Sequence, residues 1–169
     1  MIIGHLPAGY IVSKLIVKKL THKINAKLFI LWGVLGGIAP DFDMIYFYLI
    51  DHRQYHHHTY WSHLPVVWIC MIIIGFIWYR WVENKEKAIL MLVFSVCGFI
   101  HLILDSIVGD IWWLAPWVNK PFSLFTVPAI YEPWWLNFIL HWSFYLELLI
   151  VLWAVVLWFR SDDSKSRKG

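Results

Sequence analysis

Four apolar runs, each near the length of a bilayer crossing, constrain the fold more than any other feature of this chain. They cover residues 28–50, 64–82, 88–108 and 134–159, and a membrane-spanning helix needs about 20 mainly apolar residues. Hydrophobic residues make up 60% of the chain and charged residues only 15%, a balance that excludes an ordinary soluble globular domain. The sequence therefore predicts an all-α, polytopic membrane bundle with four long spans.

A shorter apolar run at residues 6–20 predicts one further helix near the N-terminus. We expect residues 1–160 to form a single membrane-embedded domain and the polar residues 161–169 to form a disordered cytoplasmic tail. The N-terminal segment lacks a signal-peptide pattern, because its lysines follow its apolar part. We therefore expect the chain to be unprocessed.

Basic residues are divided unequally between the predicted loops. All Lys and Arg except Arg53 and Lys120 fall before residue 28, between residues 80 and 87, or after residue 159. By the positive-inside rule these segments, with Lys23 and Lys85, face the cytoplasm. The prediction is an integral protein of a prokaryotic cytoplasmic (inner) membrane with a cytoplasmic C-terminus. The net charge of +3 then reflects topology and contact with anionic membrane lipids, and gives no reason to expect nucleic-acid binding.

Two carboxylates interrupt the first long run in the segment APDFD, residues 39–43. A carboxylate in hydrocarbon costs at least about 2–3 kcal/mol, so Asp41 and Asp43 together indicate a site. Pro40 supports this interpretation, because it removes a backbone donor and breaks the helix. Such breaks are tolerated where the backbone lines a polar cavity.

Other unusual polar residues fall at a similar depth. Counted at about 1.5 Å per helical residue from the predicted cytoplasmic boundaries, they lie roughly 20 to 28 Å into the membrane. The set is His5, Asp41, His63, His101, Asp105, His141 and Glu147. Agreement between five separate segments predicts one site in the outer part of the bilayer, near the extracytoplasmic face.

These residues offer imidazole nitrogens and carboxylate oxygens without thiolates. Such donors suit zinc in an open catalytic site, and also manganese or iron. His101 and Asp105 are four residues apart, so both leave the same helix face and can reach one ion or two adjacent ions. Taken singly, this pair also fits a structural hydrogen bond, and the HHHTYWSH segment also fits a hydrated loop.

Two further carboxylates are candidates for roles beside the metal. Asp43 fits a general base, a group that orients a ligand histidine, or the wall of a solvated cavity. Glu147 is preferred to His141 because it lies deeper and its burial is more costly. Both can face one site only if their helix bends, since they are six residues apart. We place His56 and His57 in the loop, outside the ligand set.

Five short motifs follow one another over about residues 4–116: GHLPAGY, APDFD, HTYWSH, HLILD and GDIWWLAP. Their order resembles the membrane-bound metal-dependent hydrolases of bacteria and archaea, which are distantly similar to zinc-dependent phospholipase C. The resemblance implies a set of metal ligands with His58 close by and Asp105 suited to bridging two ions. The implied ligands are His5, Asp41, His63, His101 and Asp105.

This sequence departs from the family pattern at three positions. Thr59 stands where an Arg is common, Leu64 where a Ser is common, and Ser106 where a Thr is usual. These changes bear on the choice of substrate more than on metal binding.

We therefore expect a membrane-embedded metal-dependent hydrolase that cleaves a phosphoester or related ester of a lipid or lipid-linked substrate through a metal-activated water. One to three divalent ions are expected, with zinc favoured, and Asp43 and Glu147 are the candidate catalytic residues. The aromatic segment 109–135 fits a lid over the site, with Trp112, Trp113 and Trp117 at its entrance, and it also fits an aromatic belt at the membrane interface alone.

The alternative is a metal transporter or a non-catalytic metal-binding membrane protein. A transport route needs ligands that continue toward the cytoplasm. Residues 64–79 and 88–100 contain neither histidine nor a charged residue, which disfavours transport.

Overall fold

The computed structural model describes residues 1–20 and 24–166, with side chains described as far as residue 160. In this part of the chain the regular elements are all helices, which confirms the predicted all-α class. In chain order they are α1 (His5–Val17), α2 (Ala26–Ile38), η1 (Pro40–Phe42), α3 (Asp43–Leu49), η2 (His57–Thr59), η3 (Trp61–His63), α4 (Pro65–Trp81), α5 (Glu86–Asp105), α6 (Trp135–Leu140) and α7 (Ser143–Ser166).

Fewer helices are long enough to cross a membrane than the apolar runs predicted. Among the described residues, α5 and the Ser143–Arg160 part of α7 meet the length and apolarity of a span. A third span results if α2 and Pro40–Leu49, bent by 55° relative to one another, count together. The expectation of four long spans is therefore wrong, because α4 has only 17 helical residues. The expected short N-terminal helix is α1, with 13 residues.

Prolines set two of these helix limits. Pro40 begins η1 one residue after the end of α2, and its missing N–H interrupts the α-helical hydrogen bonds there. Pro65 is the first residue of α4, and Leu64 before it is extended, with φ −85° and ψ 119°, as proline favours in its predecessor. Both breaks adjoin the polar segments APDFD and HTYWSH, so the chain leaves the regular helix where these side chains gather.

Two expectations fall partly outside the described residues. Lys23, which the sequence placed on the cytoplasmic side, lies in the undescribed segment 21–23, and residues 167–169 are also not described. The structure continues α7 to Ser166. The predicted disorder of residues 161–169 stays a prediction.

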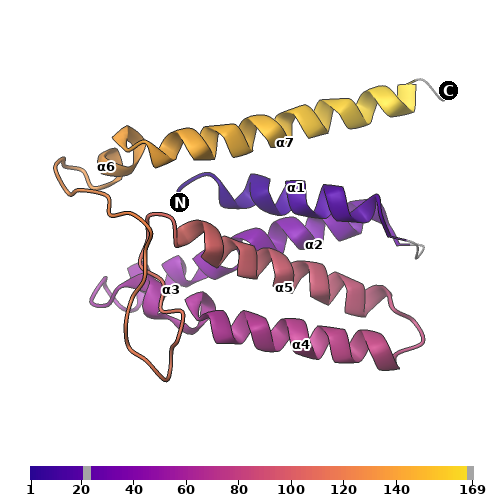
Figure 1. Cartoon of the computed structure of the whole chain (residues 1–169), viewed down its shortest axis with the longest axis horizontal. Helices are drawn as coiled ribbons and strands as arrows, with labels where there is room; N and C mark the ends of the chain where they lie inside the picture. Colours follow the sequence, from indigo (N-terminus) through magenta and orange to yellow (C-terminus); the bar gives the residue numbers. More distant parts are fainter. Residues whose placement is uncertain (21–23, 167–169) are drawn as a thin grey trace.

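The helices form a bundle with α7 on one flank (Figure 1). α2 packs against both α1 and α5, and α4 packs against α5. The core between α2 and α5 contains Phe29, Ile89, Leu90, Val93 and Cys97. α7 packs on α1 and is the less enclosed of the two long spans: 17% of its most apolar window is buried, against 56% for α5.

Glycines allow α2 to approach its neighbours closely. A Cβ added at Gly36 would lie 2.1 Å from the carbonyl oxygen of Phe94 in α5. A Cβ added at Gly9 in α1 would lie 2.6 Å from the carbonyl oxygen of Gly33 in α2. Because backbone meets backbone at both points, side chains larger than hydrogen do not fit, and the three helices are held in one register.

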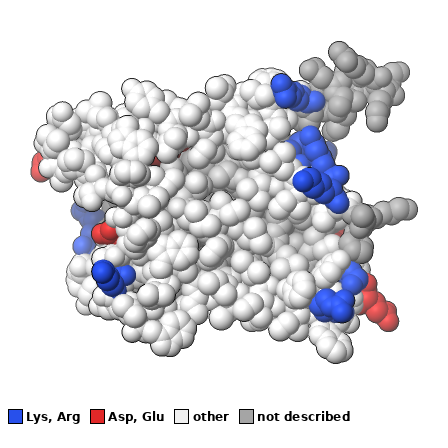
Figure 2. Space-filling model, viewed as in Figure 1, with Lys and Arg blue, Asp and Glu red and all other residues white. Residues whose placement is uncertain are grey.

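The two ends of the bundle differ in charge. Figure 1 places the N-terminus, α3, α6 and the loop after α5 at one end, and the α4–α5 turn and the end of α7 at the other. In the same view, Figure 2 shows most Lys and Arg side chains at the second end, with a largely uncharged surface between the ends. This asymmetry is the one on which the predicted topology depends.

Replacing Gly36 by Ala is expected to lower the free energy of unfolding by about 1–3 kcal/mol, because the added methyl meets backbone that cannot move aside. Gly75→Ala is the control, since its Cβ would meet a flexible side-chain atom, Cδ2 of Leu92, at 3.0 Å. Thermal unfolding of the purified proteins in detergent measures the difference. Equal melting temperatures for both variants would contradict the close α2–α5 packing.

Candidate metal centre

Three carboxylates from separate elements come together beside the broken segment. Asp41 lies in η1, Asp43 begins α3 and Asp105 ends α5. Asp43 and Asp105 are buried, whereas the Asp41 side chain is 40% exposed. The break at Pro40 places the first two beside the end of α5, against which η1 packs.

Two histidines connect these carboxylates. His101 Nε2 lies 3.0 Å from Oδ2 of Asp105 and 3.6 Å from Oδ1 of Asp41. His63 Nε2 lies 3.7 Å and 3.9 Å from the same two oxygens. Because ligand atoms bind zinc at about 2 Å, donors separated by roughly 3–4 Å can share one ion. The four residues therefore have the spacing of a common ligand set.

Three histidines are fixed through the ring nitrogen that faces away from the cluster. In each, Nδ1–H donates a hydrogen bond, which leaves Nε2 free to accept a metal, the arrangement typical of ligand histidines. The pairs are His101 with the carbonyl of Gly37 at 2.7 Å, His63 with Oδ2 of Asp43 at 2.6 Å, and His58 with the carbonyl of Asp110 at 2.9 Å.

His5 completes the cluster from the start of α1. Its ring stacks on His101, with centroids 3.6 Å apart and an interplanar angle of 20°. Its Nε2 lies 3.1 Å from Oδ1 of Asp105, and the amino group of Met1 contacts the same oxygen. Asp105 thus presents Oδ1 toward His5 and Oδ2 toward His58, His63 and His101.

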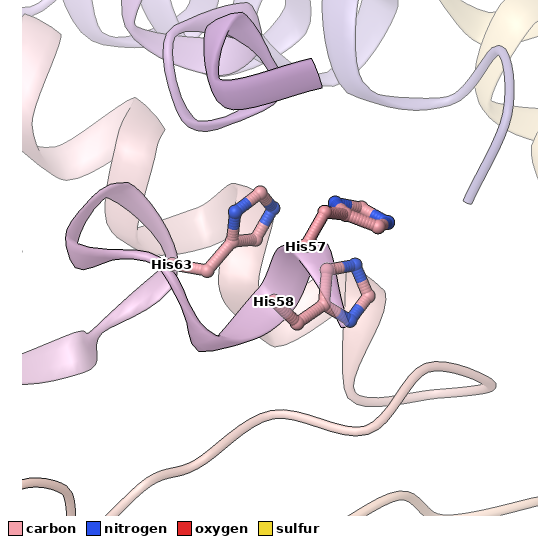
Figure 3. Close-up of side chains that lie close together, drawn as sticks. All are labelled: His57, His58 and His63. Carbon is pink, nitrogen blue, oxygen red and sulfur yellow. The ribbon is translucent and has the colours of Figure 1, made fainter. Parts of the chain in front are cut away.

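The histidine loop contributes a second face of the cluster. Figure 3 shows the rings of His57, His58 and His63 projecting into one space from η2 and η3. The structure brings His57, which the sequence placed outside the ligand set, to within 3.7 Å of Oδ1 of Asp43. His56 is exposed, and its Nδ1 accepts a hydrogen bond from the backbone N–H of His58 at 3.3 Å. His56 therefore shapes the loop.

The donor atoms of this cluster fit a divalent cation. Three overlapping groups have ligand atoms within 4.8 Å of one another: His57, His58 and His63; His5, His101 and Asp105; and Asp41, His63 and His101. Among the described residues, six buried atoms of the cluster lack a hydrogen-bond partner: Nδ1 of His5, Oδ1 of Asp43, Nδ1 of His57, Nε2 of His63, Nε2 of His101 and Oδ2 of Asp105. Buried carboxylates need a compensating positive charge. In the described part of the chain, the ion pairs of Asp41, Asp43 and Asp105 are formed with histidines and the Met1 amino group, and none is formed with Lys or Arg.

Electrostatics distinguish two members of the histidine loop. Burial lowers the pKa of His58 to about 2, so its ring is neutral at neutral pH and keeps a lone pair. Burial also acts to lower the pKa of His63, but the charge of Asp105 and the charge and hydrogen bond of Asp43 raise it to about 9. The position of His63 therefore favours positive charge, as expected beside two carboxylates.

One carboxylate oxygen of Asp43 accepts two hydrogen bonds. Its Oδ2 accepts hydrogen bonds from Nδ1–H of His63 at 2.6 Å and from the hydroxyl of Ser62 at 2.7 Å. Of the roles that the sequence left open, these contacts fit a group that orients a ligand histidine. A part for Asp43 in catalysis stays a prediction.

Glu147 lies in α7 and is 2% exposed. Its Oε2 accepts hydrogen bonds from the backbone N–H groups of Ile2, Ile3 and Gly4 at 2.8, 2.6 and 3.0 Å. These three residues lead directly into His5, so Glu147 holds in place the segment that carries His5. Its predicted catalytic role is not tested by these contacts and stays a prediction.

His141 stands at the break between α6 and α7. Its Nδ1 lies 2.9 Å from the hydroxyl of Ser143, the first residue of α7.

The long loop after α5 returns to the end of α5, because Leu124 N–H donates to the carbonyl of Ser106 at 2.8 Å. Trp113 Nε1–H donates to the hydroxyl of Ser106 at 2.9 Å. The loop is thus tied to the end of α5, next to Asp105.

Sequence reasoning missed the groups that orient the ligands through the main chain. The carbonyls of Gly37 and Asp110 belong to residues whose side chains carry no signal for this role. These carbonyl acceptors become visible only in the folded chain.

A family model described as YdjM inner membrane protein matches residues 1–162, which include every residue of the donor cluster. No curated protein and no solved structure matches the chain. The family description agrees with the apolar helices in indicating an integral protein of the inner membrane. It carries no statement of activity, so the resemblance to metal-dependent hydrolases stays a prediction.

Replacing Asp43 by Asn is expected to weaken metal binding by about 10- to 100-fold, because a neutral amide holds Nδ1–H of His63 less firmly. Asp51→Asn is the matched control: Asp51 accepts hydrogen bonds from Tyr60 and Tyr55, outside the donor cluster. Titration of chelator-treated protein with zinc measures both affinities. Equal affinities would show that Asp43 does not orient a ligand.

Proposed function

This chain belongs to the YdjM inner membrane protein family, and we propose that within the inner membrane it acts as a metal-dependent hydrolase. Its proposed reaction is cleavage of a phosphoester or related ester of a lipid or lipid-linked substrate. One observation carries the proposal. Three carboxylates and at least four buried histidine rings converge inside an apolar bundle, with nitrogen and oxygen atoms that lack hydrogen-bond partners among the described residues.

The proposed ligands are His5, Asp41, His58, His63, His101 and Asp105, with His57 beside them. Asp105 is the proposed bridging ligand, because its two oxygens face different histidines. Nitrogen and oxygen donors without thiolate favour zinc, and also suit manganese or iron. A divalent ion at such a site lowers the pKa of water and polarises a phosphoryl oxygen.

The residues of the chain have separate tasks in this proposal. Asp43 holds the ring of His63 through Nδ1–H, and the carbonyl of Gly37 holds that of His101. Asp41 is the most exposed of the three carboxylates, so the substrate reaches the site on that side. The apolar bundle limits water around the cluster, which strengthens electrostatic contacts with an anionic substrate.

We place the site near the extracytoplasmic face. The basic end of the bundle is assigned to the cytoplasm by the positive-inside rule, and the donor cluster lies at the other end, with α3 and the N-terminus. The C-terminus is then cytoplasmic.

A metal assay combined with a hydrolysis assay tests the function. His101→Ala is expected to lose most bound zinc and most hydrolysis of a long-chain phosphoester, because it removes a ligand atom. His56→Ala, in the exposed part of the loop, is expected to retain both. Bound zinc without hydrolysis of any phosphoester or carboxylic ester would indicate a non-catalytic metal protein. Zinc movement into proteoliposomes would indicate a transporter.

The topology is tested by labelling single cysteines in a chain that lacks Cys70 and Cys97. Cysteines at positions 56 and 120 are expected to react with a membrane-impermeant maleimide on intact spheroplasts, and a cysteine at position 85 only after lysis. Reaction of position 85 on intact spheroplasts would overturn the assignment.

A further inference from the structure

An apolar groove runs along the bundle between α1, α2 and α7. Its volume is about 1240 Å³, and its walls include Leu6, Tyr10, Val34, Ile38, Val151 and Val155. Figure 1 shows α7 lying along the flank of the bundle beside α1. Because α7 packs mainly on α1 and α6 and leaves much of its own surface exposed, the groove opens sideways.

Among the described residues that line this groove, histidine, aspartate and lysine side chains stand at its two ends. His5 and Asp41 of the donor cluster line one end, and Lys14 and Lys27 line the other. His5 and Lys14 belong to the same helix, and they are roughly 14 Å apart along its axis. The groove therefore connects the candidate metal centre with the basic end of the bundle.

The size and lining of the groove fit a hydrocarbon chain. Pockets for drug-sized molecules measure about 300–1,000 Å³, and the volume of about 1240 Å³ exceeds that range. Lysines at a membrane boundary cover apolar surface with their stems and keep the ammonium group in the headgroup layer. Lys14 and Lys27 thus place this end of the groove at a headgroup layer. The rest of the groove then lies within the hydrocarbon part of the bilayer.

We propose that the groove binds the hydrocarbon chain of a long-chain phosphoester lipid, with the phosphoester against His5 and Asp41. The phosphoester end of this assignment rests on the proposed function, because the Asp41 carboxylate repels an anion unless a cation is bound beside it. The donor group of Asp41, His63 and His101 is where that cation binds. With the basic end in the cytoplasm, the lipid has the orientation of the outer leaflet.

Access to the site is then lateral, along α2 and α7. Trp112 donates a hydrogen bond to Oδ1 of Asn119, and Trp113 donates one to the hydroxyl of Ser106. Trp117 is 77% exposed. None of these three is among the described residues that line the groove, and their place at the entrance stays a prediction. The groove itself is lined by apolar residues of the helices, aliphatic side chains together with Tyr10, Trp158 and Phe159.

Adjacent valines of α7 provide matched variants. Val155 lines the groove, whereas Val156, which is exposed to a similar extent, does not. The probe is a long-chain alkyl phosphate with a diazirine in its chain, incorporated with the protein in phosphatidylcholine nanodiscs. Val155→Trp is expected to lower photolabelling of α2 and α7 by about 10-fold, because the indole would occupy part of the groove that the alkyl chain needs. Val156→Trp is expected to label as the original chain does.

Peptide mapping by mass spectrometry decides the outcome. Equal labelling of both variants, or adducts confined to other helices, overturns the proposal. Disulfides between two copies of a Val155→Cys chain, without lipid adducts, assign the groove to a second copy and also overturn it. Metal-dependent hydrolysis of a water-soluble phosphoester is measured separately on the original chain. Groove labelling without this hydrolysis supports the lipid groove and refutes the proposed function, whereas hydrolysis without groove labelling refutes the groove alone.

Discussion

The cost of placing carboxylates inside an apolar bundle governs this structure. At a bilayer centre one Asp costs about 2.5–3.5 kcal/mol on insertion scales, and here Asp41, Asp43 and Asp105 lie together. The chain meets this cost by surrounding them with histidines and by fixing those histidines through Nδ1. The interrupted helix at Pro40 and the tight α2–α5 contact bring the acidic segment to the end of α5. Both features therefore serve to place the carboxylates beside the histidines.

The convergence of the cluster residues was predictable because a bilayer turns sequence position into depth. His101 and Asp105 lie in the apolar run 88–108, and His63 borders the run 64–82. Their similar predicted depth anticipated that they meet. Their orienting partners were not predictable, since the carbonyl of Gly37 acts through the main chain. The three amides that Glu147 binds have no side-chain signature either.

The number of long spans was overpredicted for a related reason. Hydropathy reports the environment of a residue and says little about its backbone conformation. Leu64 and Val82 are apolar and were counted with α4, yet both are extended. His141, at the break before α7, is also extended, so the run 134–159 is two helices. Proline positions carried part of this information, and Pro40 was recognised as a break, whereas Pro65 was not used as a helix start.

The position of Asp105 as the last residue of α5 has a thermodynamic consequence. The partial negative charge of a helix C-terminus opposes a carboxylate there, whereas Asp43, as the first residue of α3, has a favourable dipole. A cation bound at Asp105 offsets both the carboxylate and the helix end, and only the folded chain assembles its site. At a free ion concentration 100 times the Kd, such linkage adds about 2.7 kcal/mol to stability. On the proposed function, the lifetime of this protein in the membrane would follow the supply of the proposed ion, and metal starvation would deplete the protein itself through turnover of unfolded chains.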